Sequence, residues 1–430
     1  MRLQKYKKNH LLTTDSLFFV KKNKRKIIND PVYGFINTGT DLVFDIIEHP
    51  YFQRLRRIKQ LGLTDLVYPG ALHTRFHHAL GAMHLMGEAL KTLRTKGHSI
   101  SDEEFEAAQI AILLHDIGHG PFSHVLEATL LNEVHHEQIS KRVMELLNVE
   151  FKGNLAMAIQ MFADKYHRKF FNQLISSQLD IDRLDYLNRD SFFTGVSEAS
   201  IGAERIIKML NIVDDKIVVE QKGIYSIENF LNARRFMYWQ VYLHKTAIVA
   251  EEMLIQIIKR AKYLAKTTDN IETLPNLLFF IKNEINLEIF KNNIEIVDRF
   301  LMLDDYDIWA AIKLWVSHPD YTLSTLCKNL LNRNLFKIKW SDEPLGESEI
   351  RNIKKGILKN KNIDNQTLEY FFIENTATNS AYQNSNQNIN ILTNDGQIIE
   401  ITDASDLPTI KALSNIVKKY YVCWPKDVSL

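Results

Sequence analysis

Residues 113–124 read LLHDIGHGPFSH, an apolar helix end that runs directly into His115 and Asp116. Two further histidines, His119 and His124, follow in a turn broken by glycine and proline. Burying an unpaired polar group costs on the order of 2–7 kcal/mol, so a histidine and an aspartate in such a run need partners or a metal ion. We therefore expect compensating groups elsewhere in the chain.

The composition is that of an ordinary globular protein. Of 430 residues, 45% are hydrophobic and 24% charged, and 53 basic residues nearly balance 52 acidic ones for a net charge of +1. This balance argues against a general electrostatic nucleic-acid binder. Two distant cysteines, Cys327 and Cys423, predict no disulfide framework. The chain has neither a run of about 18 apolar residues nor a signal-like start, so we expect a cytoplasmic location and no membrane partner.

Hydrophobic spacing predicts a mainly α fold with a small C-terminal α+β lobe. Residues 1–40 form an N-terminal strand and turn segment, residues 41–335 a helical domain, and residues 336–430 the lobe. The helices are expected over 101–115, 136–148, 155–164, 228–266 and 292–304. In the lobe, Asn394-Asp395-Gly396 predicts a hairpin, residues 407–424 a last helix, and the polar tract NTATNSAYQNSNQN a mobile loop.

A first partner for the histidine–aspartate pair lies upstream, in the helical segment 73–93. On a helical wheel His78 falls on the apolar side, with Arg75 one turn away on the same side. A lone inward histidine is more often a hydrogen-bonded core residue than a ligand. The neighbouring arginine, which keeps its charge, favours a bound anion at this place.

A second partner lies downstream, in SSQLDIDRLDYLNRDSFFTG. One helix face carries Asp182, Tyr186 and Arg189. The alternative is a charged surface helix with local ion pairs, which suits Asp185 and Arg189. It suits Asp182 less well, because its face is partly apolar. The segment holds four aspartates in all: Asp180, Asp182, Asp185 and Asp190.

Two imidazoles and two carboxylates from three helices then form one donor set. Mixed nitrogen and oxygen ligands suit a divalent ion such as Fe, Mn, Zn or Mg. The charge of such an ion offsets the free-energy cost of burying Asp116. The ion also lowers the pKa of a bound water and polarises phosphorus. The predicted ligands are His78, His115, Asp116 and Asp182.

The pattern H(78)…HD(115–116)…D(182) resembles the signature of HD-domain phosphohydrolases. The sequence stretches around this pattern point to a smaller group of proteins. They are NDPVYGFI, YFQRLRRIKQLG, RFHHALGAMH, LLHDIGHGPFSH, HHEQIS, DIDRLDYLNRDSFFTGV and RRFMYWQVYLHKT. In this order they are similar to dNTP triphosphohydrolases, in particular bacterial relatives of the SAM-and-HD-domain enzyme. The resemblance covers roughly residues 25–330, and no SAM domain precedes it.

The resemblance implies roles for further residues. Arg75 matches an α-phosphate contact, and His119 and His124 match histidines at the scissile phosphate, with His124 as the candidate general acid and His136 in support. Substrate contacts are implied for Gln60, Leu61, Arg75, Arg183, Tyr186, Arg234, Tyr238 and Tyr242. Lys245 adds a positive charge for the triphosphate, and a flat tyrosine beneath the sugar would exclude a 2′-hydroxyl. Three residues differ from those of the SAM-and-HD-domain enzyme at the matching positions: Glu127, Tyr238 and Leu243. These differences leave the preference for a nucleotide base open.

A second nucleotide site is also implied by the resemblance. Matching residues are Lys26, Asn29, Glu48, Gln53 and Arg56, of which Gln53 and Arg56 are three apart and share one helix face. The alternative is a surface salt-bridge patch worth about 0–1 kcal/mol per pair.

The predicted function is metal-dependent hydrolysis of a dNTP, dGTP first, to deoxynucleoside and tripolyphosphate. We expect a homo-oligomer, dimer or tetramer, with a possible activating nucleotide. Two alternatives are another HD phosphohydrolase, acting on a nucleoside monophosphate, alarmone or cyclic dinucleotide, and a nucleic-acid-binding protein with a vestigial site.

Overall fold

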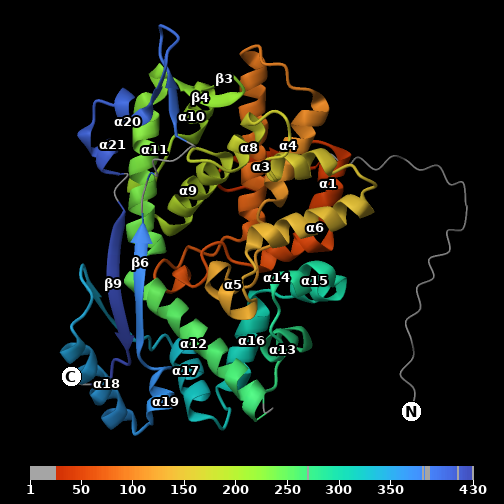
Figure 1. Cartoon of the computed structure of the whole chain (residues 1–430). Helices are drawn as coiled ribbons and strands as arrows, with labels where there is room; N and C mark the ends of the chain where they lie inside the picture. Colours follow the sequence, from red (N-terminus) through yellow and green to blue (C-terminus); the bar gives the residue numbers. More distant parts are fainter. Residues whose placement is uncertain (1–25, 269–270, 380–381, 383–387, 414–415, 429–430) are drawn as a thin grey trace, which may run out of the picture.

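The computed structural model describes residues 26–428 except 269–270, 380–381, 383–387 and 414–415. Most described residues lie in helices, with short strands gathered in three small sheets (Figure 1), which confirms the mainly α prediction. No helix among these residues is both long and apolar enough to cross a bilayer.

The described chain begins with a hairpin. Strands β1 (Ile27–Asp30) and β2 (Gly34–Asn37) pair antiparallel around the predicted turn, where the carboxylate of Asp30 accepts the backbone N–H of Val32 at 2.9 Å. Helices α1 (Asp41–Glu48) and α2 (Pro50–Gln53) follow, and then 3₁₀ turns at Arg54–Arg57 and Thr64–Leu66.

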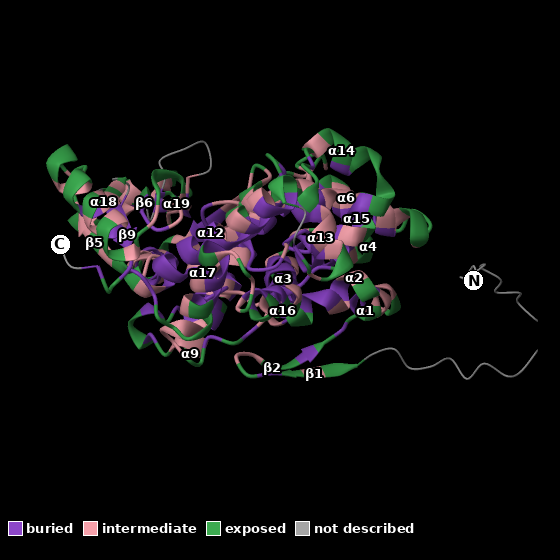
Figure 2. Cartoon of the chain, turned by 90° about the horizontal axis from the view of Figure 1, so that it is seen from below, coloured by how far each residue is buried: buried purple, intermediate pink, exposed green. Residues whose placement is uncertain are grey.

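Three central helices carry the predicted ligands. These are α3 (Arg75–Thr95), α4 (Asp102–Leu114) and α9 (Ile181–Thr194), and α3 packs against both others. Helix α4 starts at a capping box between Ser101 and Glu104. In Figure 2 the buried residues gather around α3 and around α12 (Lys245–Thr267) and α17 (Tyr321–Leu331), so the predicted ligand His78 on α3 lies in the buried interior.

The remaining helices enclose this core. They are α5 (His124–Leu130), α6 (His136–Glu150), α7 (Ala156–Phe162), α8 (Phe170–Ile175), α10 (Ala203–Met209), α11 (Ile224–Met237), α13 (Pro275–Lys282), α14 (Leu287–Asn292), α15 (Ile294–Leu301) and α16 (Asp305–Trp315), with 3₁₀ turns at Ser197–Ala199 and Gln221–Gly223.

The helix expected over 228–266 is two helices. Helix α11 ends at Met237, a π-helical turn spans Tyr238–Tyr242, and α12 begins at Lys245. The imidazole of His244 caps α12 by accepting the N–H of Thr246 at 3.1 Å. Because a π turn is bonded from i to i+5, it interrupts the regular α-helical spacing at Tyr238 and Tyr242.

The C-terminal residues build two sheets. One is the antiparallel order β5 (Lys337–Ser341), β9 (Val417–Trp424), β6 (Ile373–Asn379), beside α18 (Glu347–Lys361) and α19 (Asn365–Leu368). The other joins β3 (Leu210–Val213) and β4 (Lys216–Glu220) to β7 (Asn390–Leu392) and β8 (Ile398–Glu400). Strand β7 runs parallel to β4, so one sheet crosses the boundary expected near residue 335.

Two predictions for this part have different outcomes. The hairpin at Asn394-Asp395-Gly396 is confirmed, with Gly396 at φ +83°. The helix expected over 407–424 is wrong in its second half, because α21 (Pro408–Ala412) ends early and β9 pairs on both edges. Short helix α20 (Ile401–Ala404) precedes it. The predicted mobile loop lies partly in β6 and partly outside the described residues.

Candidate metal centre and active-site cavity

Four side chains from α3, the end of α4 and α9 converge on one point. Nε2 of His78 lies 3.1 Å from Oδ1 of Asp182 and 3.4 Å from Nε2 of His115. Asp116 lies 3.7 Å from His78 and 3.4 Å from His115. Ligands about 2.1 Å from one ion are about 3.0–3.4 Å apart, so this donor set fits a divalent cation.

The other nitrogen of each ligand imidazole is held by the protein. Nδ1 of His78 lies 2.7 Å from the carboxylate of Asp185, and Nδ1 of His115 lies 2.6 Å from the carbonyl of Ile112. Both contacts direct the Nε2 lone pair toward the ion site, as outer partners of metal-ligating histidines do.

Asp185 and Arg189 do form the expected i, i+4 pair, but they are not on the surface. Both are fully buried, and Arg189 also donates to Asp30 at 2.7 Å. A Cβ on Gly81 of α3 would lie 2.0 Å from the Asp185 carboxylate, so only glycine admits the pair here. The surface interpretation is wrong because both side chains are buried, with Asp185 in contact with the predicted ligand His78.

The electrostatics of the site favour a cation. Burial alone would lower the pKa of His78, yet Asp182 and Asp185 raise it to about 10. Burial opposes ionisation of Asp182, and hydrogen bonds from His115 and His78 nevertheless hold its pKa well below the usual value. Negative charge therefore dominates this buried point, which a divalent ion would neutralise.

The loop after Asp116 is fixed from several sides. The buried guanidinium of Arg54 donates to the carbonyls of His119 at 2.8 Å and Leu303 at 2.7 Å. Asp305 accepts the N–H groups of Phe122 and Lys59, both at 2.8 Å. Phe122 has φ +55°, which a phenylalanine rarely adopts, so these bonds hold a strained turn.

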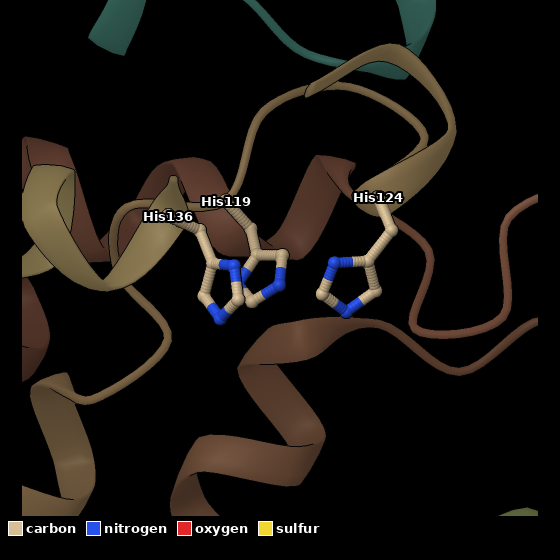
Figure 3. Close-up of side chains that lie close together, drawn as sticks. All are labelled: His119, His124 and His136. Carbon is tan, nitrogen blue, oxygen red and sulfur yellow. The ribbon is translucent and has the colours of Figure 1, made fainter. Parts of the chain in front are cut away.

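Three predicted histidines meet beside this turn (Figure 3). The rings of His119 and His136 stack with centroids 3.9 Å apart, and His124 lies edge-on at 5.0 Å from His119. Burial and the charge of Arg75 hold the pKa of His119 well below its usual value, so that imidazole is neutral at pH 7. Glu127 lies 3.1 Å from Nδ1 of His124 and 3.3 Å from Nδ1 of His136.

A cavity of about 480 Å³ opens over both groups. Arg75 lies in its wall, paired with Asp116 and donating to Ser123 at 2.8 Å. Predicted residues in the lining are Gln60, Leu61, Arg75, Asp116, His119, His124, His136, Asp182, Tyr186, Tyr238 and Tyr242. Most of the predicted substrate and catalytic side chains therefore face one volume.

Three predicted phosphate contacts lie elsewhere. Arg183 pairs with Asp180, the cap of α9, and Arg234 is buried against Gln178 at 3.1 Å. Lys245 is exposed at the start of α12. None of the three is in the cavity lining, so their roles as substrate contacts stay predictions.

Sequence reasoning missed groups that shape the cavity. The hydroxyl of Tyr242 donates to Asp190 at 2.7 Å, and Asp190 lies 2.7 Å from Nε2 of the buried His73. Glu251 lines the cavity and also an adjoining hollow of about 270 Å³ that strand β6 borders. Asp190 could have been suggested by its spacing from Asp182 in the same helical segment. His73 and Glu251 could not, because each is an isolated polar residue in a helical pattern.

The predicted activator residues lie on the N-terminal side. Arg56, in the 3₁₀ turn, donates to Gln53, the last residue of α2, at 2.8 Å, and its guanidinium lies 3.5 Å from the centroid of the Phe76 ring. Lys26 lies 4.6 Å from the centroid of the Phe44 ring. Asn29 and Glu48 are exposed. Their assignment to a nucleotide stays a prediction.

Comparison with known proteins agrees with this geometry. Residues 75–190 match the HD domain and residues 201–276 an HD associated region. The chain is 31% identical to the uncharacterized protein YwfO of Bacillus subtilis, covering 95% of this chain and 94% of that one. It is 28% identical to the deoxynucleoside triphosphate triphosphohydrolase SAMHD1 homolog of Dictyostelium discoideum, over 84% of this chain and 71% of the relative.

A solved structure is closer in sequence. The crystal structure of a phosphohydrolase from Bacteroides thetaiotaomicron superposes with a TM-score of 0.90 at 53% identity, covering 93% of this chain and 99% of that chain. The helical fold and the histidine–aspartate site thus define a hydrolase with a divalent-metal centre. The chain belongs to the HD-domain phosphohydrolases, in the group that includes relatives of the dNTP triphosphohydrolases.

Proposed function

We propose that the protein hydrolyses deoxynucleoside triphosphates, dGTP first, to deoxynucleoside and tripolyphosphate. One observation carries the proposal: a single cavity joins Asp116 and Asp182 of the metal centre to a wall formed by Leu61, Tyr186 and Tyr242. Its volume of about 480 Å³ is within the usual range for a small-molecule site of roughly 300–1,000 Å³. The name of the Dictyostelium relative supports the same substrate class.

The chain's own residues supply the rest of the reaction. A divalent ion held by His78, His115, Asp116 and Asp182 would supply a Lewis acid and an activated water. Arg75 holds a phosphate oxygen, the attacking oxygen bonds to the α-phosphorus, and the bond from phosphorus to the 5′ oxygen breaks. His124 donates the proton that the departing 5′ oxygen needs, with Glu127 orienting its ring.

The sugar is selected by shape. The Tyr242 ring is held by its bond to Asp190, and Leu61 and Gln60 line the same cavity. Oε1 of Gln60 is buried without a partner among the described residues, so the amide can take the 3′-hydroxyl as a donor. A 2′-hydroxyl against the tyrosine and leucine would lose its hydrogen bonds, which disfavours ribonucleotides.

The test is a panel of the four dNTPs and four NTPs with product identification. We expect tripolyphosphate and deoxynucleoside from dNTPs, fastest from dGTP, and little product from NTPs. Asp182→Ala should abolish turnover and lose metal with the fold retained by circular dichroism. Equal rates on GTP and dGTP would remove the sugar gate, while normal catalysis and metal content in Asp182→Ala would remove that ligand.

The same assay separates the alternatives. Orthophosphate from a monophosphate, or cleavage of an alarmone or cyclic dinucleotide, would indicate a different HD phosphohydrolase. No product with any nucleotide would favour a nucleic-acid-binding protein with a vestigial site. We further propose that the chain acts as a homo-oligomer and that a second nucleotide activates it.

A further inference from the structure

The three histidines beside the metal centre form a second donor cluster. His119, His124 and His136 each offer a nitrogen, and these atoms lie within 4.8 Å of one another. They come from the turn after Asp116, from the start of α5 and from the start of α6. Figure 3 shows the three rings facing one another. The cluster shares no histidine with the set of His78 and His115.

The hydrogen bonds of these rings leave lone pairs on one kind of nitrogen. Nδ1 of His119 lies 3.3 Å from the carbonyl of Asp116, and Glu127 takes Nδ1 of both other rings. Nε2 of His119 is buried with no partner among the described residues, on a side chain that is 2% exposed. Nε2 of His136 lies 3.6 Å from the exposed carboxylate of Glu137.

This is the bonding pattern of metal-ligating histidines. In such histidines a carbonyl or carboxylate holds one ring nitrogen and the other nitrogen binds the ion, so the contacts at Nδ1 here would leave Nε2 for a metal. Burying the Nε2 atom of His119 without a partner costs free energy that a bound cation would recover. The His124 side chain is 67% exposed, so it can rotate to complete the coordination.

We propose that His119, His124 and His136 bind a second divalent ion of the borderline transition-metal type, such as Zn²⁺ or Co²⁺. Three imidazoles with an open fourth position are an established zinc environment, and the all-nitrogen donors disfavour Mg²⁺. Glu127 is the positioning residue, because it touches Nδ1 of two of the three rings.

The second site would adjoin the first through Asp116. Nδ1 of His119 lies 3.4 Å from Oδ1 of Asp116, and both residues line the same cavity. An ion at the histidine cluster would therefore lie beside the bound substrate and occupy the imidazole of His124. Under the proposed function, filling this site with Zn²⁺ takes away the general acid and lowers turnover.

The test measures metal content on the full chain, independently of any substrate. The protein is stripped with a chelator, loaded with Zn²⁺, exchanged into metal-free buffer and measured by elemental analysis. We expect two equivalents in the wild type, one in His124→Gln and one in His136→Gln. Asp182→Ala, which damages the first site, should also retain one, and combining it with His124→Gln should leave none.

His135→Gln is the matched control. His135 is adjacent, 71% exposed, and also 3.6 Å from Glu127, but it lies outside the cluster. It should keep two equivalents. One equivalent in the wild type, or two in His124→Gln, would overturn the second site. These outcomes do not depend on dNTP hydrolysis, so a failure of the proposed function would leave the measurement valid.

Discussion

The ligand His78 depends on a residue that never touches the metal. Its Nδ1 contacts Asp185 at 2.7 Å, and Asp185 is itself paired with Arg189. Asp185→Asn keeps a hydrogen-bonding group but removes the charge that orients and polarises the imidazole. We expect metal affinity to fall by about 10–100-fold, measured by competition with a chelating dye.

Asp180→Asn is the control for this change. Asp180 is a buried aspartate at the start of the same helix, but it accepts the N–H groups of Ser177 and Arg183, both at 2.7 Å, and pairs with the Arg183 guanidinium. Its replacement should leave metal affinity within about twofold. If both variants lose affinity equally, the role of Asp185 is general support of α9.

Glu251 predicts a pH dependence of stability. Burial, with Glu252 nearby, raises the pKa of Glu251 from about 4.5 to about 8. Between these values the folded state holds a proton that the unfolded state has lost, so this group destabilises the fold progressively as pH rises from 4.5 to 8. Glu251→Gln removes the titrating group and with it this pH-dependent destabilisation.

The gain should therefore appear only at higher pH. We expect Glu251→Gln to unfold like the wild type near pH 5 and to be more stable near pH 8, by on the order of 1–3 kcal/mol. Urea unfolding across this pH range measures the difference. A gain that is equal at every pH would assign the effect to packing.

At the residue scale, the sequence was enough to predict which four side chains converge at the candidate metal centre. His115 and Asp116 are adjacent in an apolar run, and His78 and Asp182 fall on partly apolar faces, so burial could be inferred from local pattern. Asp185 could not be placed, because an i, i+4 aspartate–arginine pair looks the same on a surface and in a core. Its burial depends on Gly81 of another helix.

The element that matters most is the turn that follows Asp116. A Cβ on Gly118 would lie 2.3 Å from the carbonyl of His136 and 2.4 Å from the N–H of Ser140, at the start of α6. Gly118→Ala must therefore push the turn away from α6 and separate His119 from His136. We expect a loss of about 1–3 kcal/mol in unfolding free energy and a lower kcat.

Gly346→Ala provides the comparison. Among the described residues, apart from its two chain neighbours, no atom lies within 4 Å of a Cβ at Gly346, the N-cap of α18. That variant should match the wild type in urea unfolding and in kcat. Wild-type behaviour of Gly118→Ala would show that the turn and α6 are not rigidly joined.

Helices and strands were predicted well where the hydrophobic period and the capping residues indicate the same element. They were predicted poorly where the backbone changes from one regular conformation to another. The pattern of 228–266 is continuously helical, so the π-helical turn at Tyr238–Tyr242 leaves no mark in it. In VKKYYVCW, apolar spacing fits a helix, but the β-branched and aromatic residues pair with strands β5 and β6, which are distant in sequence. Partners of this kind are not encoded locally.

At the scale of the whole molecule, separate regions meet around one cavity. Glu251 of α12 borders both the main cavity and the adjoining hollow, and the hollow is lined by Thr376, Ala377 and Thr378 of β6. On the other side, α3 joins the metal centre to the 3₁₀ turn at Arg54–Arg57, because the guanidinium of Arg56 lies over the ring of Phe76 on α3. A ligand bound at Arg56 would therefore lie next to Phe76, which directly follows the cavity residue Arg75 in the chain.

That connection gives the expected effect of a second nucleotide. The guanidinium of Arg56 lies over the Phe76 ring and donates to Gln53, so its position is defined while its side chain stays on the surface. Under the proposed function, a phosphate paired with Arg56 and Lys26 would stabilise the proposed oligomer and its active arrangement. We expect added nucleotide to raise the dNTPase rate and to shift sedimentation toward the larger species.

Arg56→Ala should lose this stimulation, measured as the ratio of rates with and without the added nucleotide. Arg57→Ala is the matched control, because Arg57 is the next residue, carries the same charge, is 45% exposed and pairs with Asp304 instead. It should keep the wild-type ratio. Equal loss in both variants would indicate a general effect of surface charge. A ratio of one in the wild type, with no change in sedimentation, would leave Arg56 and Gln53 as a surface pair that stabilises α2 and the turn after it.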